Sequence, residues 1–305
     1  FTALVFVMFP RVGLSLLLLG QDHRERVVGF SDRVDLGGVG RLRADPTIVM
    51  RVEHPNLPAE PPVRLALYLR GAAFDRYNGH SWSRTTGSTQ VRAEQLGNSV
   101  RIRRWPDPAH DRKLRIDLEA IDPSVVFVPP DAAALTILTP TNVVPSAIPT
   151  LYMSQEGQLT YRTSSEGGLR YEVALADGNE SPVQPLDPVT RARYLALPAD
   201  LPARVGELAK SWIGNETDPE RRAKRVEAAL RKGYRYDLES PSGGAKNPLD
   251  DFLFVSKRGH CEFYSTAMAV MLRTQGVPTR NVNGFIGGTF NRFGRYYAVR
   301  QGDAH

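Results

Sequence analysis

The single cysteine of this sequence, Cys261, is the residue from which nucleophilic chemistry would start. It follows Gly259 and His260 and opens a Met-containing segment whose apolar residues recur at helical spacing up to Gln275. A thiol in the first turn of a helix lies near the positive end of the helix dipole, which favours the thiolate. The position therefore indicates a cysteine nucleophile, with a buried and inert cysteine as the alternative.

A cysteine nucleophile needs an imidazole close by to take its proton. The six histidines are His23, His54, His80, His110, His260 and His305. The first four belong to the N-terminal part of the chain, and the side chain of His260 should leave its neighbour Cys261 in another direction. His305 follows the predicted strand 296–300 and a short turn, which would return it to the start of the Cys261 helix. We expect His305 to be the base.

Three segments around these two residues resemble the core of the transglutaminase-like superfamily. They are Arg258 to Ser265, Leu272 to Phe285, and Asp303 to His305. The superfamily pattern is a Gly-x-Cys helix start, a Leu-Arg-x-x-Gly-Ile/Val-Pro-x-Arg turn into a strand, and an Ala-His on the following strand. The segment Asn247 to Phe254 also resembles the approach to the family cysteine. The resemblance implies a papain-like α+β core with Cys261 as nucleophile and His305 as base.

The same resemblance leaves two parts of the site unassigned. The third catalytic member of the family is an acid on the strand after the histidine, and the sequence given stops at His305. Asp303 would share the face of His305 on a strand, yet it does not occupy the family's acid position. The backbone N–H of Cys261 and an upstream polar side chain would stabilise the oxyanion, and the sequence does not identify that side chain.

The N-terminal half carries a second resemblance, to bacterial proteins of the TgpA type. It rests on Val34 to Leu42 and on Tyr68 to Trp82. In that group several transmembrane helices precede a periplasmic β domain and a transglutaminase-like domain. We therefore expect residues 1–20, which are largely apolar, to be the end of a transmembrane helix and a membrane-proximal segment. A signal peptide and a buried strand pair are the alternatives.

The pattern along the rest of the chain predicts an α+β protein in two parts. Residues 21–182 contain short apolar runs separated by Pro, Gly, Asn and Asp, which is typical of an antiparallel β-sandwich-like domain. The expected runs are 47–52, 63–69, 114–118, 125–128, 135–138, 159–161 and 171–175. A Pro-rich linker at 181–188 then leads into residues 183–305, a transglutaminase-like catalytic domain that we expect to be incomplete at its C-terminus.

The second part should contain two well-marked helices and two strands. A capping pattern at Thr217 to Glu220 and a glycine at position 233 frame a helix over 221–232. The Cys261 helix should stop at Gln275, before Gly276 and Pro278. Strands over 280–285 and 295–300 should then be joined by a turn through Gly287 and Gly288.

Composition excludes several classes of function. The net charge of +6 comes mainly from arginines that are scattered along the chain, so no nucleic-acid-binding face is expected. One cysteine excludes an intrachain disulfide and a Cys-cluster metal site. No calcium-binding loop pattern is present. We expect neither a metal nor another cofactor.

The sequence thus predicts a membrane-anchored cysteine acyltransferase on the periplasmic side of the bacterial inner membrane. Its expected substrate is a protein or peptide, with a cell-wall peptide as one candidate, and the bond attacked is a glutamine carboxamide or a peptide or isopeptide bond. Both crosslinking and hydrolysis remain open. A catalytically inactive envelope scaffold is the main alternative. A β-sandwich adhesin with Tyr77, Trp82 and Trp105 lining a groove is a further one.

Overall fold

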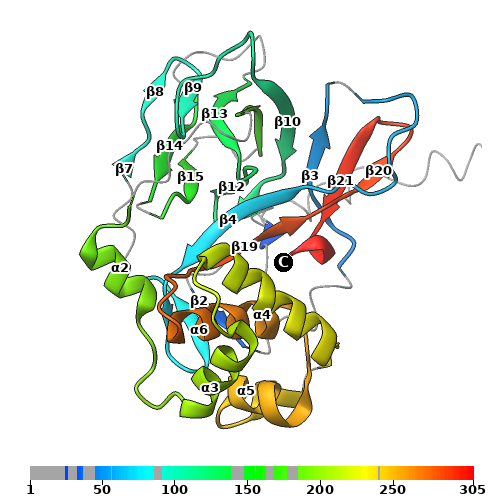
Figure 1. Ribbon diagram of the computed structural model, residues 1–305. Coiled ribbons are helices and arrows are strands. Elements are labelled where there is room, and N and C mark those ends of the chain that lie inside the picture. Colours follow the sequence, from blue (N-terminus) through cyan, green and yellow to red (C-terminus); the bar gives the residue numbers. More distant parts are fainter. Residues whose placement is uncertain are drawn as a thin grey trace, which may run out of the picture.

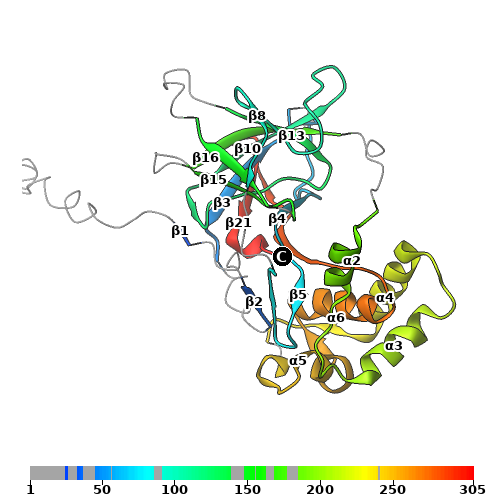
Figure 2. The ribbon, with the colours of Figure 1, turned by 90° about the vertical axis from the view of Figure 1, so that its left-hand side faces the viewer.

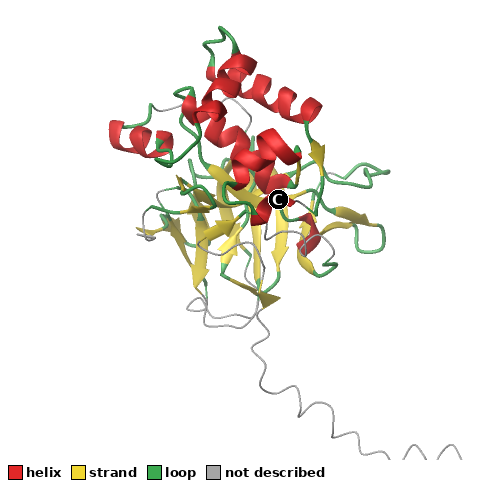
Figure 3. Cartoon of the chain, turned by 90° about the horizontal axis from the view of Figure 1, so that it is seen from below, coloured by secondary structure: helices red, strands yellow, loops and turns green. Residues whose placement is uncertain are grey.

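The computed structural model describes most of the chain after residue 44. The described residues are 25–26, 33–36, 45–55, 57–85, 91–138, 148–154, 156–162, 168–176, 185–239 and 241–305. Figure 1 shows the sheets gathered in the upper part of the molecule and the helices in the lower part, with β4 (Tyr68–Phe74) and β19 (Asn281–Ile286) running between them. Seen from below, the helices lie on one side of the strands (Figure 3).

The largest sheet has eight strands, and every neighbouring pair in it is antiparallel. Its strands in spatial order are β20 (Thr289–Asn291), β21 (Tyr296–Arg300), β3 (Ile48–Glu53), β10 (Arg112–Leu118), β16 (Leu169–Leu175), β13 (Ala132–Ile137), β9 (Ser99–Arg101) and β8 (Gln95–Leu96). Alternation explains β10, because Leu114, Ile116 and Leu118 are buried whereas the charged residues between them face outward.

A four-stranded antiparallel sheet packs against the large one. Its strands in spatial order are β12 (Val125–Val126), β15 (Leu159–Arg162), β14 (Thr150–Met153) and β7 (Val91–Arg92). Side chains of both sheets, such as Ile116 of β10 and Leu151 of β14, belong to one apolar core. The sandwich-like arrangement predicted for the N-terminal half is therefore confirmed.

Shorter strands complete the sheet structure. They are β1 (Glu25–Arg26) with β11 (Ile121–Asp122), β2 (Arg33–Asp35) with β6 (Ser81–Ser83) and β5 (Arg76–Tyr77), and β17 (Arg235–Tyr236) with β18 (Arg258–Gly259). The pairs β1–β11 and β17–β18 are parallel. The strand β4 pairs antiparallel with β19, so one strand from each half of the chain joins the two regions (Figure 2).

Five α-helices follow in the described part of the second half. They are α2 (Pro188–Leu195), α3 (Ala203–Ile213), α4 (Pro219–Gly233), α5 (Pro248–Asp251) and α6 (Cys261–Thr274), with a π-helical turn η4 (Phe252–Ser256) and two 3-10 turns, η3 (Pro241–Gly244) and η5 (Gln301–Asp303). Asp218 caps α4, because its carboxylate accepts the N–H of Arg221 at 2.8 Å. The helix α6 is central and packs against the other four helices.

Each of the two apolar cores draws on both halves of the chain. The core between the sheets includes Phe285 and Tyr297, and the core around α6 includes Phe74 and Trp82. The division of the chain at residue 182 stays a prediction, and the structure adds that strands on either side of it share sheets. Tyr77 and Trp82 are buried core residues, which contradicts the alternative of a binding groove lined by them.

The predicted elements match the structure where the local pattern was strong. The α+β class is confirmed, and the Cys261 helix ends at Thr274. The run 63–69 was wrong as a strand, since β4 begins only at Tyr68. The prediction of two strands joined by a glycine turn missed a third strand. Gly287 and Gly288 lead into β20, which forms a hairpin with β21.

No helix in the described ranges is both long and apolar enough to cross a bilayer. The predicted membrane segment, residues 1–20, lies outside the described residues, as do positions 181–184 of the predicted linker.

Candidate active site

Cys261 is the first residue of α6, and the elements before it fix its position. The π-helical turn η4 ends at Lys257, whose backbone is left-handed with φ 49°, and β18 then leads into the helix. Gly259 is tightly enclosed, since an added Cβ would lie 3.0 Å from Phe252 and Phe263. Cys261 is 8% exposed. Its thiol therefore sits at the N-terminal end of a buried helix, where the dipole favours a thiolate.

His260 precedes the helix as its N-cap and points into the protein. Its side chain is 1% exposed, and its ring meets Phe263 edge-on with 5.1 Å between the centroids. The Nδ1 atom lies 3.8 Å from a carboxylate oxygen of Glu262. The adjacent histidine is thus enclosed in the packing around the helix start.

His305 is held by backbone pairing with β19. Its N–H donates to the carbonyl oxygen of Gly284, and the N–H of Gly284 donates to the carbonyl oxygen of His305, both at 2.9 Å. Ala304 forms a bridge with Phe285 in the same pairing. Since α6 packs against β19, the helix that begins with Cys261 and the segment that carries His305 border the same strand. The imidazole is exposed to solvent.

The strand β19 can lie this close to β4 only because position 284 is a glycine. An added Cβ would be 1.9 Å from the carbonyl oxygen of Leu69. The register between the strands shifts between Val282 and Gly284, and the side chain of Asn283 accepts the N–H of Ala72 at 3.1 Å. This local irregularity fixes the position of Gly284, the residue with which His305 pairs.

Asp303 has a local role in this structure. It belongs to the 3-10 turn η5, and its carboxylate accepts the backbone N–H of Arg300 at 2.9 Å. The turn itself is tied to the N-terminal half, because Gln301 and Gly302 donate to the carbonyl oxygens of Thr47 and Asp45. Asp303 therefore caps the turn that returns the chain to β19, and it does not lie on a strand with His305.

Sequence reasoning missed a set of buried charges at the other end of α6. The guanidinium of Arg273 donates to the carbonyl oxygens of Asp75, Ala196 and Thr279 at 2.6–2.8 Å and lies over the ring of Trp82 at 4.9 Å. Burial lowers the pKa of Arg273 to about 10. The Leu-Arg of the family pattern marked this residue, although its role became visible only in three dimensions.

The turn between β14 and β15 completes this charged set. The carbonyl oxygen of Glu156 accepts hydrogen bonds from Arg70 and Arg280, and its carboxylate lies 3.6 Å from Arg193. Arg193 also contacts the buried carboxylate of Asp75 at 3.2 Å. Burial and the nearby charge of Arg280 lower the pKa of Arg70 to about 10. These contacts fix β4 and β19 against the sandwich.

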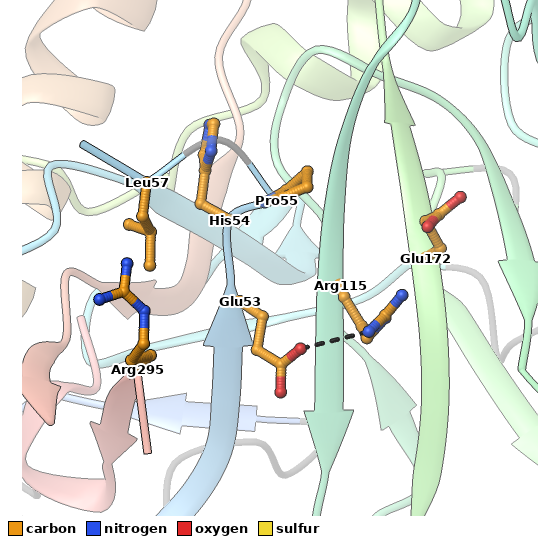
Figure 4. Close-up of a pocket in the computed structure, with 7 residues that line it drawn as sticks. All are labelled: Glu53, His54, Pro55, Leu57, Arg115, Glu172 and Arg295. Carbon is orange, nitrogen blue, oxygen red and sulfur yellow. Dashed lines mark hydrogen bonds and ion pairs between the residues drawn. The ribbon is translucent and has the colours of Figure 1, made fainter. Parts of the chain in front are cut away.

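A pocket of about 200 Å³ lies on the large sheet, away from these residues. Arg295 lies at one end of it and Glu172 at the other, with Glu53 and Arg115 between them at 3.4 Å (Figure 4). Neither Cys261 nor His305 lines this pocket. Among the described residues, no group of His, Cys, Asp and Glu is arranged to hold a metal ion.

Comparison with models of known families shows to which family the chain belongs. Residues 1–182 match the model of the TgpA N-terminal domain. The chain belongs to the TgpA family. Residues 206–305 match the transglutaminase-like superfamily, so the segment with Cys261 and His305 is a transglutaminase-like core. The resemblances seen in the sequence are thereby confirmed for both halves.

Two curated relatives and two solved structures of this family are similar to the chain. A protein-glutamine gamma-glutamyltransferase of Pseudomonas aeruginosa is 29% identical over 99% of the chain and 41% of its own length. The uncharacterised protein YebA of Bacillus subtilis is 34% identical over 37% of the chain and 16% of its own length. The chain thus spans about two fifths of the first relative.

The solved structures are both of the periplasmic domain of TgpA from P. aeruginosa. The alignment with the first structure covers 91% of the chain and 88% of that structure, with a TM-score of 0.67 and 25% sequence identity. The alignment with the second structure, which is bound to ethylmercury, covers 91% of the chain and 90% of that structure, with a TM-score of 0.66 and 25% sequence identity. The fold described above is thus that of the TgpA periplasmic domain.

Proposed function

We propose that the chain supplies the cysteine and histidine of a cell-envelope acyltransferase that acts on a glutamine carboxamide, or on a peptide or isopeptide bond. The observation that carries this proposal is the placement of Cys261 at the buried start of α6, a helix that packs against the strand β19 to which His305 is paired. The similarity to a protein-glutamine gamma-glutamyltransferase favours the carboxamide.

In the proposed reaction the Cys261 thiolate attacks the carbonyl carbon of the substrate. A C–S bond forms, the C–N bond breaks, and His305 gives its proton to the departing ammonia or amine. An amine or water then attacks the thioester and releases the cysteine. We expect the backbone N–H of Cys261, in the first turn of α6, to stabilise the oxyanion.

The proposed setting is the periplasmic side of the bacterial inner membrane, with residues 1–20 as part of the anchor. The match to a periplasmic domain supports this setting. The substrate would be a protein or peptide, and a peptide of the cell wall is one candidate that this location offers. We do not propose Asp303 as the acid of a triad, because its carboxylate is engaged in capping the turn η5.

The test measures the alkylation rate of Cys261 against pH in the folded protein. As this is the single cysteine, every thiol event reports on it. We expect an apparent pKa well below about 8.5, the ordinary value of a cysteine, and a rise toward that value in His305→Ala. The exposed His110 provides a matched control, since His110→Ala should leave the profile unchanged.

A second measurement separates reactivity from catalysis. Ammonia release from a glutamine-containing peptide should require both Cys261 and His305, and Cys261→Ser should abolish it. A pKa near or above that of an ordinary thiol, indifferent to His305→Ala, would contradict the catalytic pair and leave an envelope scaffold as the function.

A further inference from the structure

The segment after β17 runs alongside the residues that lead into α6. β17 and β18 are parallel, with Tyr236 opposite Gly259, and the N–H of Asp237 donates to the carbonyl oxygen of Gly259 at 2.9 Å. Asp237 is thus bonded to a residue two positions before Cys261, and Leu238 follows it directly. The chain therefore brings a second segment next to the residues that lead into the nucleophile.

Two apolar side chains of this segment stay partly exposed beside the buried thiol. Tyr236 is 43% exposed and Leu238 is 38% exposed. The ring of Tyr236 stacks on Tyr264 with 6.1 Å between the centroids and 29° between the planes. Tyr264 lies one helical turn after Cys261, and its ring meets Phe252 edge-on at 5.3 Å. A column of aromatic rings thus runs from the core to the surface and ends at Tyr236, which pairs with Gly259 two residues before Cys261.

The residue between these two side chains holds the segment in place. One carboxylate oxygen of Asp237 accepts the N–H of Glu239 at 3.0 Å, and the other lies 3.6 Å from Arg258. These two contacts of Asp237 fix the backbone between Tyr236 and Leu238. The surface of these two residues is therefore formed before any substrate arrives, which lowers the entropic cost of binding to it.

We propose that Tyr236 and Leu238 form a subsite for an apolar side chain of the acyl-donor polypeptide, next to the residue that reacts with Cys261. This inference rests on the function proposed above and names its substrate class: polypeptides in which an aromatic or branched aliphatic residue neighbours the reactive glutamine. Covering the Tyr236 ring and Leu238 removes apolar surface from water on both partners and holds the carboxamide against the thiol.

The experiment uses two short peptide probes that differ at one position. In each, the glutamine carboxamide is replaced by a chloromethyl ketone, and the neighbouring residue is leucine in one probe and serine in the other. The Cys261 thiolate displaces chloride, so that a C–S bond forms as the C–Cl bond breaks. Inactivation rates at several probe concentrations separate binding from reaction, and iodoacetamide measures the intrinsic reactivity of the thiol.

We expect the wild-type protein to prefer the leucine probe by about tenfold, the range of one apolar contact in a specificity pocket. Tyr236→Ala and Leu238→Ser should bring that ratio close to one through weaker binding, with the iodoacetamide rate unchanged. Tyr236→Phe should keep the preference. Val189→Ser is the matched control, because Val189 is an apolar residue of α2 that is 78% exposed.

The results distinguish a failure of the subsite from a failure of the proposed function. A reactive thiol with no leucine preference, or with a preference that survives both Tyr236→Ala and Leu238→Ser, would overturn the subsite and leave the proposed function intact. A thiol that reacts slowly with iodoacetamide and ignores His305→Ala would overturn the proposed function and the subsite with it. Circular dichroism of Leu238→Ser, a surface change, shows that any loss is not unfolding.

Discussion

Cys261 and His305 are held in place by two different kinds of structure. The cysteine depends on neighbours that are close in sequence, namely the turn η4, the strand β18 and the first turn of α6. The histidine depends on β19, which is held by β4 through contacts such as Asn283 to Ala72, 211 residues apart. The difference teaches that the β-rich half supports the histidine side, because without β4 the strand β19, to which His305 is paired, has no partner.

The largest expected effect is on the histidine side. Gly284→Ala would place a Cβ 1.9 Å from the carbonyl oxygen of Leu69, so β19 must separate from β4. We expect a loss of more than about 3 kcal/mol in the free energy of unfolding, measured by urea denaturation. The control is Gly233→Ala, where an added Cβ meets nothing within 4 Å. Equal stability of the two variants would show that the β4–β19 contact yields easily.

The next effect concerns the charges that tie β4 to the helices. Asp75→Ala removes a buried carboxylate that contacts Arg193 at 3.2 Å and accepts the N–H of Thr85 at 2.8 Å. The change leaves the Arg193 guanidinium with Glu156 alone and the N–H of Thr85 without this acceptor, which should cost about 3 kcal/mol, seen as a lower urea midpoint.

The matched control for this change is Glu220→Ala, which breaks the exposed pair with Lys224. It should leave the midpoint unchanged, because an exposed ion pair is screened by water. A loss in Asp75→Ala no larger than in the control would mean that water replaces the missing carboxylate.

A smaller effect is expected on the cysteine side. Gly259→Ala would bring a Cβ to 3.0 Å from the ring of Phe252 and from the Cβ of Phe263, and the Phe252 ring can shift where a backbone carbonyl cannot. An overlap at 3.0 Å is milder than one at 1.9 Å, so we expect a loss of about 1–2 kcal/mol and a changed alkylation rate of Cys261. A loss as large as that of Gly284→Ala would remove the contrast between the two sides of the site.

The smallest effect tests how local the cysteine side is. The indole N–H of Trp82 donates to the hydroxyl of Thr266 in α6 at 2.9 Å, so one buried hydrogen bond links the N-terminal half to the cysteine helix. A double-mutant cycle with Trp82→Phe and Thr266→Val should give a coupling free energy of about 1 kcal/mol. A coupling of zero would mean that this hydrogen bond does not stabilise the contact between the N-terminal half and the cysteine helix.

The same contrast explains how much of the molecule the sequence could predict. The start and end of α6 follow from short-range signals, since Gly276 and Pro278 stop the helix. The placement of Cys261 as the first residue of α6 could therefore be predicted from the sequence. The role of Cys261 and His305 in catalysis stays a prediction, whereas the family that motivated it is confirmed.

The pairing that holds His305 could not be predicted, because no local pattern encodes partners in distant parts of the chain. The wrong strand at 63–69 shows this directly. Leu65 and Leu67 do pack against the core, but they do so from an irregular segment that exchanges hydrogen bonds with Gly287 and Gly288. A run of apolar residues thus predicts burial, but it does not identify the neighbouring strand whose pairing defines a strand.

The pairing of β3 with β21 and of β4 with β19 also sets the order in which the molecule can fold. Strands made early in synthesis must wait for partners that lie far along the sequence, and such distant contacts slow folding. Until β19 and β21 are made, β3 and β4 present unpaired edges that can associate with other chains. The histidine segment pairs with β19, so it can dock only after β19 has met β4.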